Sequence, residues 1–159
     1  TAIALTIKGG RVTAEQVGWM HETFRRLDPQ VIRIVVTHHP IDLPEGHDER
    51  HLVGRARMAM EILASCGVDV FLAGHLHTSH TFHSTTRYRI KGHSALVIQA
   101  GTATSSRGRG ELNAFNVVRL DAPRLKVERF EWQQSEGRFH PAITEQFHRT
   151  PDGWVSSDV

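Results

Sequence analysis

Apolar residues recur at helical spacing near the start of the chain and indicate an amphipathic helix. Thr13 is followed three residues later by Gln16, a capping-box pattern, so we expect the helix to begin there. It should run for about 14 residues and end at Asp28-Pro29, because the residue before a proline disfavours helical geometry. The apolar stripe, which should pack on a sheet, consists of Val17, Met20, Phe24 and Leu27.

Two short apolar runs have the β-branched composition of buried parallel strands. The first covers residues 31–36 and leads into Thr37-His38-His39-Pro40, and the second covers residues 68–73 and leads into Gly74-His75-Leu76-His77. A helix from about His51 to Ser65, after a polar loop, should connect them, which predicts a right-handed crossover in a parallel sheet. The interior of this sheet should contain Ile34, Val36, Val70 and Leu72.

The later part of the chain shows strand patterns without intervening helices, which favours antiparallel pairing. The fold class that we expect is therefore α/β: a β-sandwich with flanking helices, in which a parallel βαβ part is followed by antiparallel strands in a mixed arrangement. We expect one domain over residues 1–159, with a C-terminal tail at residues 137–159 that the pattern leaves unassigned. The later strands should cover residues 81–90, 95–100, 113–120 and 125–132.

Composition narrows the class of protein. The 159 residues suffice for one domain with a core, and 39% hydrophobic and 23% charged residues are ordinary for a globular chain. A formal net charge of +2 does not require a nucleic-acid-binding surface. The single cysteine, Cys66, excludes an internal disulfide and fits a reducing compartment, so we expect a cytoplasmic protein. No apolar run approaches the roughly 20 residues that span a bilayer, so we expect no membrane partner.

Histidine is the residue that stands out, with 12 in the chain. In this composition a Gly-His-x-His match is expected by chance about 0.07 times, and Gly74-His75-Leu76-His77 also follows a predicted strand. Because the ends of parallel strands share one edge of a sheet, His38 should join His75 and His77 there. Three imidazoles form either a mononuclear zinc site or part of a larger site, and nitrogen ligands suit Zn, Fe, Mn, Co or Ni.

Three segments together resemble the C-terminal half of the calcineurin-like metallophosphoesterases, particularly their bacterial phosphodiesterase-like members. They are VIRIVVTHHP, VDVFLAGHLH and QAGTATSSRGRGELNAFNVV, within roughly residues 9–120. In that family the first half supplies D-x-H, G-D-x-x-D and G-N-H-[DE] segments, and the second half supplies a His after one strand and a G-H-x-H after the next. This sequence contains the last two patterns only, because Asp-x-His, Gly-Asp-x-x-Asp and Gly-Asn-His occur nowhere in it.

The resemblance implies a site for two divalent or trivalent transition-metal ions, in which His38 and His75 bind one ion and His77 binds the other. A missing N-terminal half, or another copy of the chain, would supply the bridging Asp, the remaining ligands and the His that protonates the leaving group. The catalytic residues of this chain itself are therefore unknown. In the complete enzyme, a water between two ions about 3.5 to 4 Å apart would attack the phosphorus in line. The implied function is the hydrolysis of phosphate esters, with phosphodiesters of nucleotide-like small molecules as the favoured substrates.

Two side-chain assignments and two other functions stay open. His39 could contact the substrate phosphate, although strand packing explains a second histidine equally well. Arg107 and Arg109, in the glycine-rich loop, are either anion contacts or solvated residues. The chain could instead be a catalytically incomplete metal-binding fragment or regulatory module. A nuclease of the same superfamily is the further alternative, although the small net charge argues against an extended DNA surface.

Overall fold

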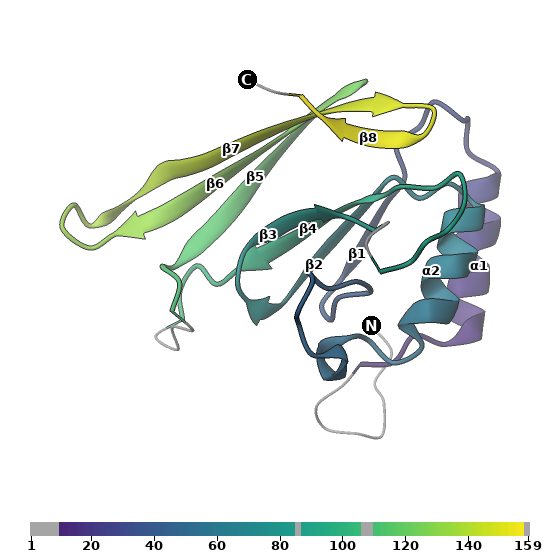
Figure 1. Ribbon diagram of the computed structural model, residues 1–159, viewed down its shortest axis with the longest axis horizontal. Coiled ribbons are helices and arrows are strands. Elements are labelled where there is room, and N and C mark those ends of the chain that lie inside the picture. The colour runs from purple at the N-terminus through teal and green to yellow at the C-terminus, as the bar shows by residue number, and fades with distance from the viewer. Residues whose placement is uncertain (1–9, 85–86, 106–109, 158–159) are drawn as a thin grey trace.

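Two four-stranded sheets stack on each other, and two helices cover the far side of the first sheet (Figure 1). This is seen in a computed structural model, which describes residues 10–84, 87–105 and 110–157. The predicted α/β class, with a parallel part followed by antiparallel strands, is confirmed. The elements are α1 (Ala14–Arg25), β1 (Ile34–Thr37), the 3₁₀ helix η1 (Glu49–His51), α2 (Ala56–Ser65), β2 (Val70–His77), β3 (His80–His83), β4 (Leu96–Gly101), β5 (Ala114–Asp121), β6 (Arg124–Gln133), β7 (Arg138–Thr150) and β8 (Gly153–Ser156).

Helix α1 begins where the sequence predicts. The Gln16 backbone N–H donates to the Thr13 hydroxyl at 3.1 Å, and the Thr13 N–H donates to the Gln16 side chain at 3.0 Å. Val17 is fully buried, as expected of the apolar stripe. The prediction for Leu27 is wrong, because α1 ends at Arg25 and leaves this side chain 37% exposed.

The second helix is shorter than predicted. The chain forms η1 and then leaves helical geometry until Ala56, because the Val53 N–H donates to the Pro40 carbonyl at 2.9 Å and cannot join a helix. Arg55, at the N-cap of α2, adopts a left-handed conformation with φ of 68°. Ala59, Met60 and Leu63 of α2 are fully buried in the core between the helices and the first sheet. No helix in the described residues is both long and apolar enough to cross a bilayer.

The first sheet has the strand order β1-β2-β4-β3. Strands β1, β2 and β4 run parallel, and only β3 pairs antiparallel in this sheet. The antiparallel pairing that we expected for all later strands therefore does not hold for β4 with β2. Val70 is buried and Leu72 is partly buried, as predicted. The predictions for Ile34 and Val36 are wrong, since these side chains are 37% and 72% exposed. The reason is that β1 forms an edge of the sheet, which makes it only half covered.

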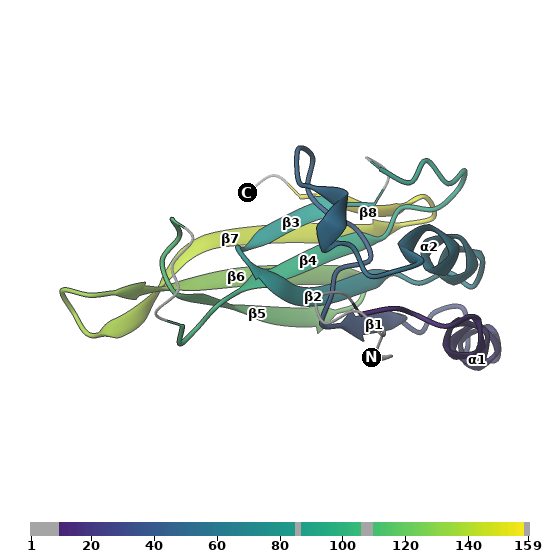
Figure 2. The same ribbon diagram turned by 90° about the horizontal axis from the view of Figure 1, so that it is seen from below.

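The second sheet is an antiparallel meander of β5, β6, β7 and β8. Buried side chains from three of its strands pack against the first sheet, namely Leu125, Val127, Phe147 and Trp154. The β6–β7 hairpin extends beyond the first sheet as an arm (Figures 1 and 2). Most of the tail at residues 137–159 belongs to β7 and β8, so it completes this sheet.

Candidate metal centre

The ends of β1 and β2 meet at one edge of the first sheet. In the parallel register Thr37 lies opposite Ala73, so the residues that follow each strand are neighbours. The Gly74 N–H donates to the carbonyl of His38 at 3.2 Å and ties the two strand ends together. Parallel pairing therefore brings His38 and His75 to the same place, which is where the sequence analysis expected a site.

Three imidazoles form a compact group at this edge. His38, His39 and His75 each offer one ring nitrogen, and these three atoms lie within 4.8 Å of one another. The ring centroids are 5.0 Å apart for His38 and His39, 5.4 Å for His38 and His75, and 4.2 Å for His39 and His75. His39, which the sequence suggested as a substrate contact, lies among the possible ligands.

His77 does not belong to this group of three among the described residues. Its Nδ1 is buried and has no hydrogen-bond partner in the described part of the chain, and the same holds for Nδ1 of His39. A buried ring nitrogen without a partner is costly unless something else occupies its lone pair or takes its proton. A metal ion bound to these ring nitrogens would supply the missing partner.

The backbone at the Gly-His-x-His segment is strained at its histidines. His75 has φ of 74° and His77 has φ of 63°, both in the left-handed region, whereas Gly74 does not adopt a positive φ. This conformation costs roughly 1–2 kcal/mol for a residue with a Cβ. The two presumed ligands, rather than the glycine, therefore adopt the left-handed conformation in this turn. Such strain persists where the surroundings fix it, and it concentrates at functional sites.

Gln99 holds this segment from the neighbouring strand. Its side chain is fully buried on β4, and its Nε2 donates to the carbonyl of Gly74. Asn116 of the second sheet donates in turn to the Gln99 carbonyl at 3.3 Å. The sequence carries a signal for Gln99, because it is the polar residue in the otherwise apolar strand Leu96–Gly101.

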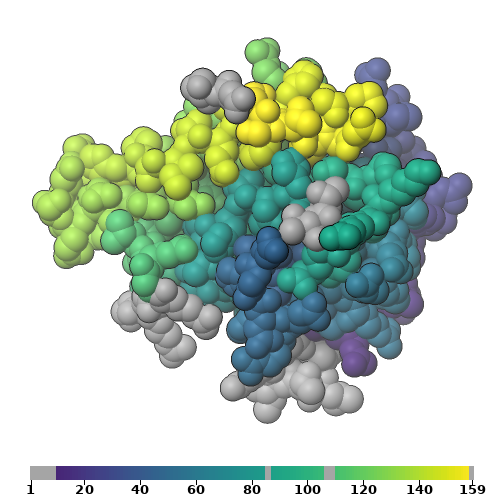
Figure 3. All heavy atoms as spheres, viewed as in Figure 1, coloured from purple at the N-terminus to yellow at the C-terminus, as the bar shows by residue number. Residues whose placement is uncertain are grey.

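The polar loop after β1 folds back toward the site and adds His51 to its rim. The ring of His51, in η1, lies 6.1 Å from the ring of His75. The ring of His47 lies 5.3 Å from that of His80 at the start of β3. The blue surface of this loop meets the teal surface of the β2–β3 region in Figure 3. No sequence pattern indicated that these loop histidines lie near the strand ends.

Arg87 holds this loop in place through ion pairs with Asp42 and Glu49. Its Nη1 lies 2.5 Å from Oε1 of Glu49 in η1, and its Nε lies 3.2 Å from Oδ1 of Asp42. Asp42 is 1% exposed, and burial raises the pKa of its carboxyl to about 6, against the lowering effects of the Leu43 N–H and the Arg87 charge. The Tyr88 hydroxyl donates to the Ile41 carbonyl at 2.9 Å. The loop that carries the extra histidines is thus fixed at both of its ends.

Burial keeps the central imidazoles neutral. Burial, together with the smaller effects of the nearby His39, His38, His51 and His77, lowers the pKa of His75 to about 4. Burial also lowers the pKa of His39, and the neighbouring His38 adds to that effect. Neutral imidazole is the form that offers a lone pair to a metal ion. His39 and His75 can therefore bind a cation at physiological pH without first losing a proton.

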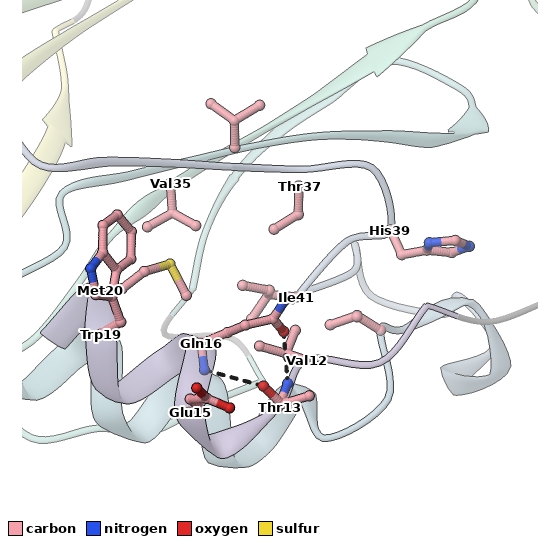
Figure 4. Close-up of a pocket in the computed structure, with 12 residues that line it drawn as sticks. Val12, Thr13, Glu15, Gln16, Trp19, Met20, Val35, Thr37, His39 and Ile41 are labelled. Atoms are coloured by element: carbon pink, nitrogen blue, oxygen red, sulfur yellow. Dashed lines mark hydrogen bonds between the residues drawn. The ribbon is translucent and has the colours of Figure 1, made fainter. Parts of the chain in front are cut away.

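A groove of about 680 Å³ runs from His39 between α1 and β1 (Figure 4). Its walls are mostly apolar and include Trp19, Val35 and Val36. Trp19 and Val36 are 71% and 72% exposed, so this side of the sandwich is open. Arg107 and Arg109, the predicted anion contacts, lie outside the described residues.

No family model matches the chain, and no curated protein matches it. Among solved structures, it is similar to crystal structures of a single mutant and a double mutant of Vps29 from Entamoeba histolytica. The single mutant aligns at 17% identity with a TM-score of 0.40, over 69% of this chain and 53% of that chain. The double mutant aligns at 16% identity with a TM-score of 0.36, over 54% of this chain and 46% of that chain. The chain thus spans about half of each structure, and at these TM-scores the likeness carries no argument about function.

Proposed function

We propose that this chain carries part of the metal centre of an enzyme that hydrolyses phosphate esters. The observation that carries the proposal is the group of three ring nitrogens from His38, His39 and His75, within 4.8 Å of one another at the ends of two parallel strands. Histidine ligands at the ends of two parallel strands agree with the resemblance of the sequence to the calcineurin-like metallophosphoesterases. The favoured substrates are phosphodiesters of nucleotide-like small molecules.

The donors suit borderline transition metals, such as Zn, Mn, Fe, Co or Ni. His38 and His75 would hold one ion and His77 a second, and His39 either joins the first pair or faces the substrate phosphate. Such ions, when bound, supply Lewis acidity and lower the pKa of a coordinated water. The chain itself contributes neutral imidazoles, a strained segment that Gln99 holds in place, and a clamped loop that brings His51 to the rim.

The remaining parts of such a centre would come from outside the described residues. The histidine group contains no carboxylate, whereas a binuclear site needs acidic ligands to balance two cations. A segment that pairs with the free edge of β1 would lie next to His38. The first candidate for that segment is an N-terminal half that carries the family's acidic motifs, and the second is another copy of this chain.

Metal analysis combined with hydrolysis of bis(p-nitrophenyl) phosphate in added Mn²⁺ tests the proposal. We expect the purified chain to bind metal, and we expect His38→Ala and His75→Ala to reduce that binding by at least roughly tenfold. His148→Ala, on the exposed face of β7, is the matched control and should leave binding unchanged. A chain that binds no metal would overturn the proposal.

A second candidate function is metal binding without turnover, in an incomplete fragment or a regulatory module. The observation in its favour is again the histidine group without a carboxylate among the described residues. The same experiment separates the two functions. Turnover that disappears in both variants supports the phosphoesterase. Bound metal with no hydrolysis, even after addition of a polypeptide that carries the missing acidic motifs, supports the binding module.

A further inference from the structure

The Gly-His-x-His segment leaves the regular pairing of its strand. The pairing of β2 with β4 shifts register between Ala73 and His77, and His75, within this interval, has a positive φ. Such a bulge interrupts the hydrogen bonds of the ladder and often changes the direction of a side chain next to an active site. The pairing of β2 with β4 therefore does not by itself fix how His75 and His77 point, and other contacts must hold them.

The first of these contacts is at Gly74, where the segment begins. The Gly74 N–H donates to the His38 carbonyl at 3.2 Å, and the Gly74 carbonyl accepts from the side chain of Gln99. Gln99 is connected in turn to the second sheet, because Asn116 of β5 donates to its backbone carbonyl at 3.3 Å. One end of the segment is thus fixed by its neighbours on both sides.

The second contact is at Ser79, just after the segment. The Ser79 N–H donates to Oε2 of Glu111 at 2.9 Å, and the Ser79 carbonyl accepts from Nη2 of Arg129 at 2.8 Å. Ser79 is also 3% exposed, and a Cβ at Gly101 would lie 2.6 Å from its hydroxyl oxygen, so the two residues pack closely. Both backbone polar groups of Ser79 are therefore bound by side chains from the later part of the chain.

The distance along the chain from Ser79 to the histidines is short. Only Thr78 and Ser79 lie between β2 and β3, so fixing the peptide groups of Ser79 restricts the backbone at His77. A left-handed conformation at a residue with a Cβ persists where the surroundings impose it. In metal sites, groups that orient the ligands without touching the ion commonly set the affinity. The hydrogen bonds at Ser79 are placed to do this for His75 and His77.

We propose that Arg129 and Glu111 are positioning residues for metal binding by His75 and His77. Neither side chain touches the ion, because each acts through the backbone of Ser79. The inference rests on the proposed function, since it requires that these histidines bind metal. It goes further in making the second sheet part of the candidate centre, because Arg129 belongs to β6 and Glu111 precedes β5.

Titration of the full chain with Co²⁺, followed by visible absorption, tests the role of Arg129. The spectrum of bound Co²⁺ reports the geometry of its ligands and needs no enzymatic activity. We expect Arg129→Met to weaken Co²⁺ binding roughly tenfold and to change the spectrum of the bound ion, with wild-type circular dichroism. Arg119→Met is the control on the same sheet, because the Arg119 side chain is 66% exposed and pairs with Glu128. It should leave both affinity and spectrum unchanged.

Two substitutions of Glu111 separate the hydrogen bond from the charge. Glu111→Met removes the acceptor for the Ser79 N–H and should weaken Co²⁺ binding roughly tenfold. Glu111→Gln keeps a carbonyl oxygen at this place and loses only the charge, so it should bind Co²⁺ like the wild type. Binding in Glu111→Gln as weak as in Glu111→Met would overturn the proposed action through the Ser79 backbone.

The outcomes separate this inference from the proposed function. Wild-type affinity and spectrum in Arg129→Met would overturn the positioning role and leave the proposed function intact, because the wild-type chain would still bind metal. A wild-type chain that binds no Co²⁺ would overturn both. Weaker binding that always accompanies a loss of the wild-type circular dichroism would show that Arg129 and Glu111 only stabilise the fold, and this too would overturn the positioning role.

Discussion

Asp42 should make the stability of the fold depend on pH in an unusual direction. Its carboxyl is 1% exposed, and only one oxygen has a hydrogen bond, from the Leu43 N–H at 2.8 Å. Oδ2 has no partner in the described residues, and Arg87 approaches Oδ1 at 3.2 Å. Burial outweighs these contacts and raises the pKa to about 6 from the ordinary value of 3.8. The fold therefore favours the protonated acid.

The sign follows from this difference in pKa. Below pH 3.8 the group is protonated in both the folded and the unfolded chain, and its contribution to stability is complete. As the pH rises to about 6, the unfolded chain loses the proton first, so the free energy of unfolding falls. At about 1.36 kcal/mol per pKa unit, the total loss is about 3 kcal/mol. Most surface carboxylates change stability in the opposite direction or not at all.

The comparison with Asp42→Asn isolates this effect, because the amide resembles the protonated carboxyl and does not titrate. Urea unfolding of both chains from about pH 4 to pH 7.5 should show the variant gaining roughly 2–3 kcal/mol relative to the wild type. Arg87 keeps its partner Glu49 in both chains. A difference between the two chains that stays within 1 kcal/mol over this range would refute the reasoning about burial.

Three further perturbations test the fold. Gly153→Ala should destabilise by roughly 2–5 kcal/mol in thermal unfolding, because φ is 116° and a Cβ would lie within 2.3 Å of the Ser94 carbonyl oxygen; an unchanged midpoint would contradict this close approach. Leu63→Ala should cost about 2–5 kcal/mol in urea unfolding, because this side chain is fully buried. We expect the chain to self-associate through the edge strand β1, and we expect Val36→Lys to reduce this self-association in sedimentation velocity. Ile143→Lys, at another exposed apolar residue, is the control. A wild-type chain that stays monomeric at every concentration would count against the edge contact.

Periodicity and strand composition were sufficient to predict both helices and the order of the elements up to β6, whereas β7 and β8 form from the tail that the pattern left unassigned. The capping box at Thr13, the two apolar runs and three of the later strands appear in the structure, but the strand predicted at residues 81–90 is, among the described residues, a strand only at His80–His83. Periodicity could not predict which strand forms an edge, because edge and central strands share a β-branched composition. Val36 was therefore assigned to the interior although it is exposed. Periodicity also could not predict the hydrogen bond from the Val53 N–H to the Pro40 carbonyl, a tertiary contact because of which α2 begins only at Ala56.

The location of the candidate site was predictable from the ends of the parallel strands, since register alone brings His38 and His75 together. The contributions of the loop were not predictable. His51 lies near His75 in a loop that Arg87, far along the chain, holds through Asp42 and Glu49. A sequence pattern carries local periodicity, whereas this clamp depends on side chains that are close only after folding.

The positive charge of bound metal ions requires that the segment completing the candidate centre supply carboxylates. Three neutral imidazoles leave the full charge of a bound dication in place, and two dications about 4 Å apart repel each other strongly in a partly buried setting. Carboxylates must then approach from a side where the chain leaves room. The first sheet ends at β1, where Val36 and Trp19 are exposed and a groove of about 680 Å³ leads to His39. Among the described residues, the edge strand β1 has no partner on its outer side and the histidine group next to it has no carboxylate, so a single acidic, strand-forming segment would supply both.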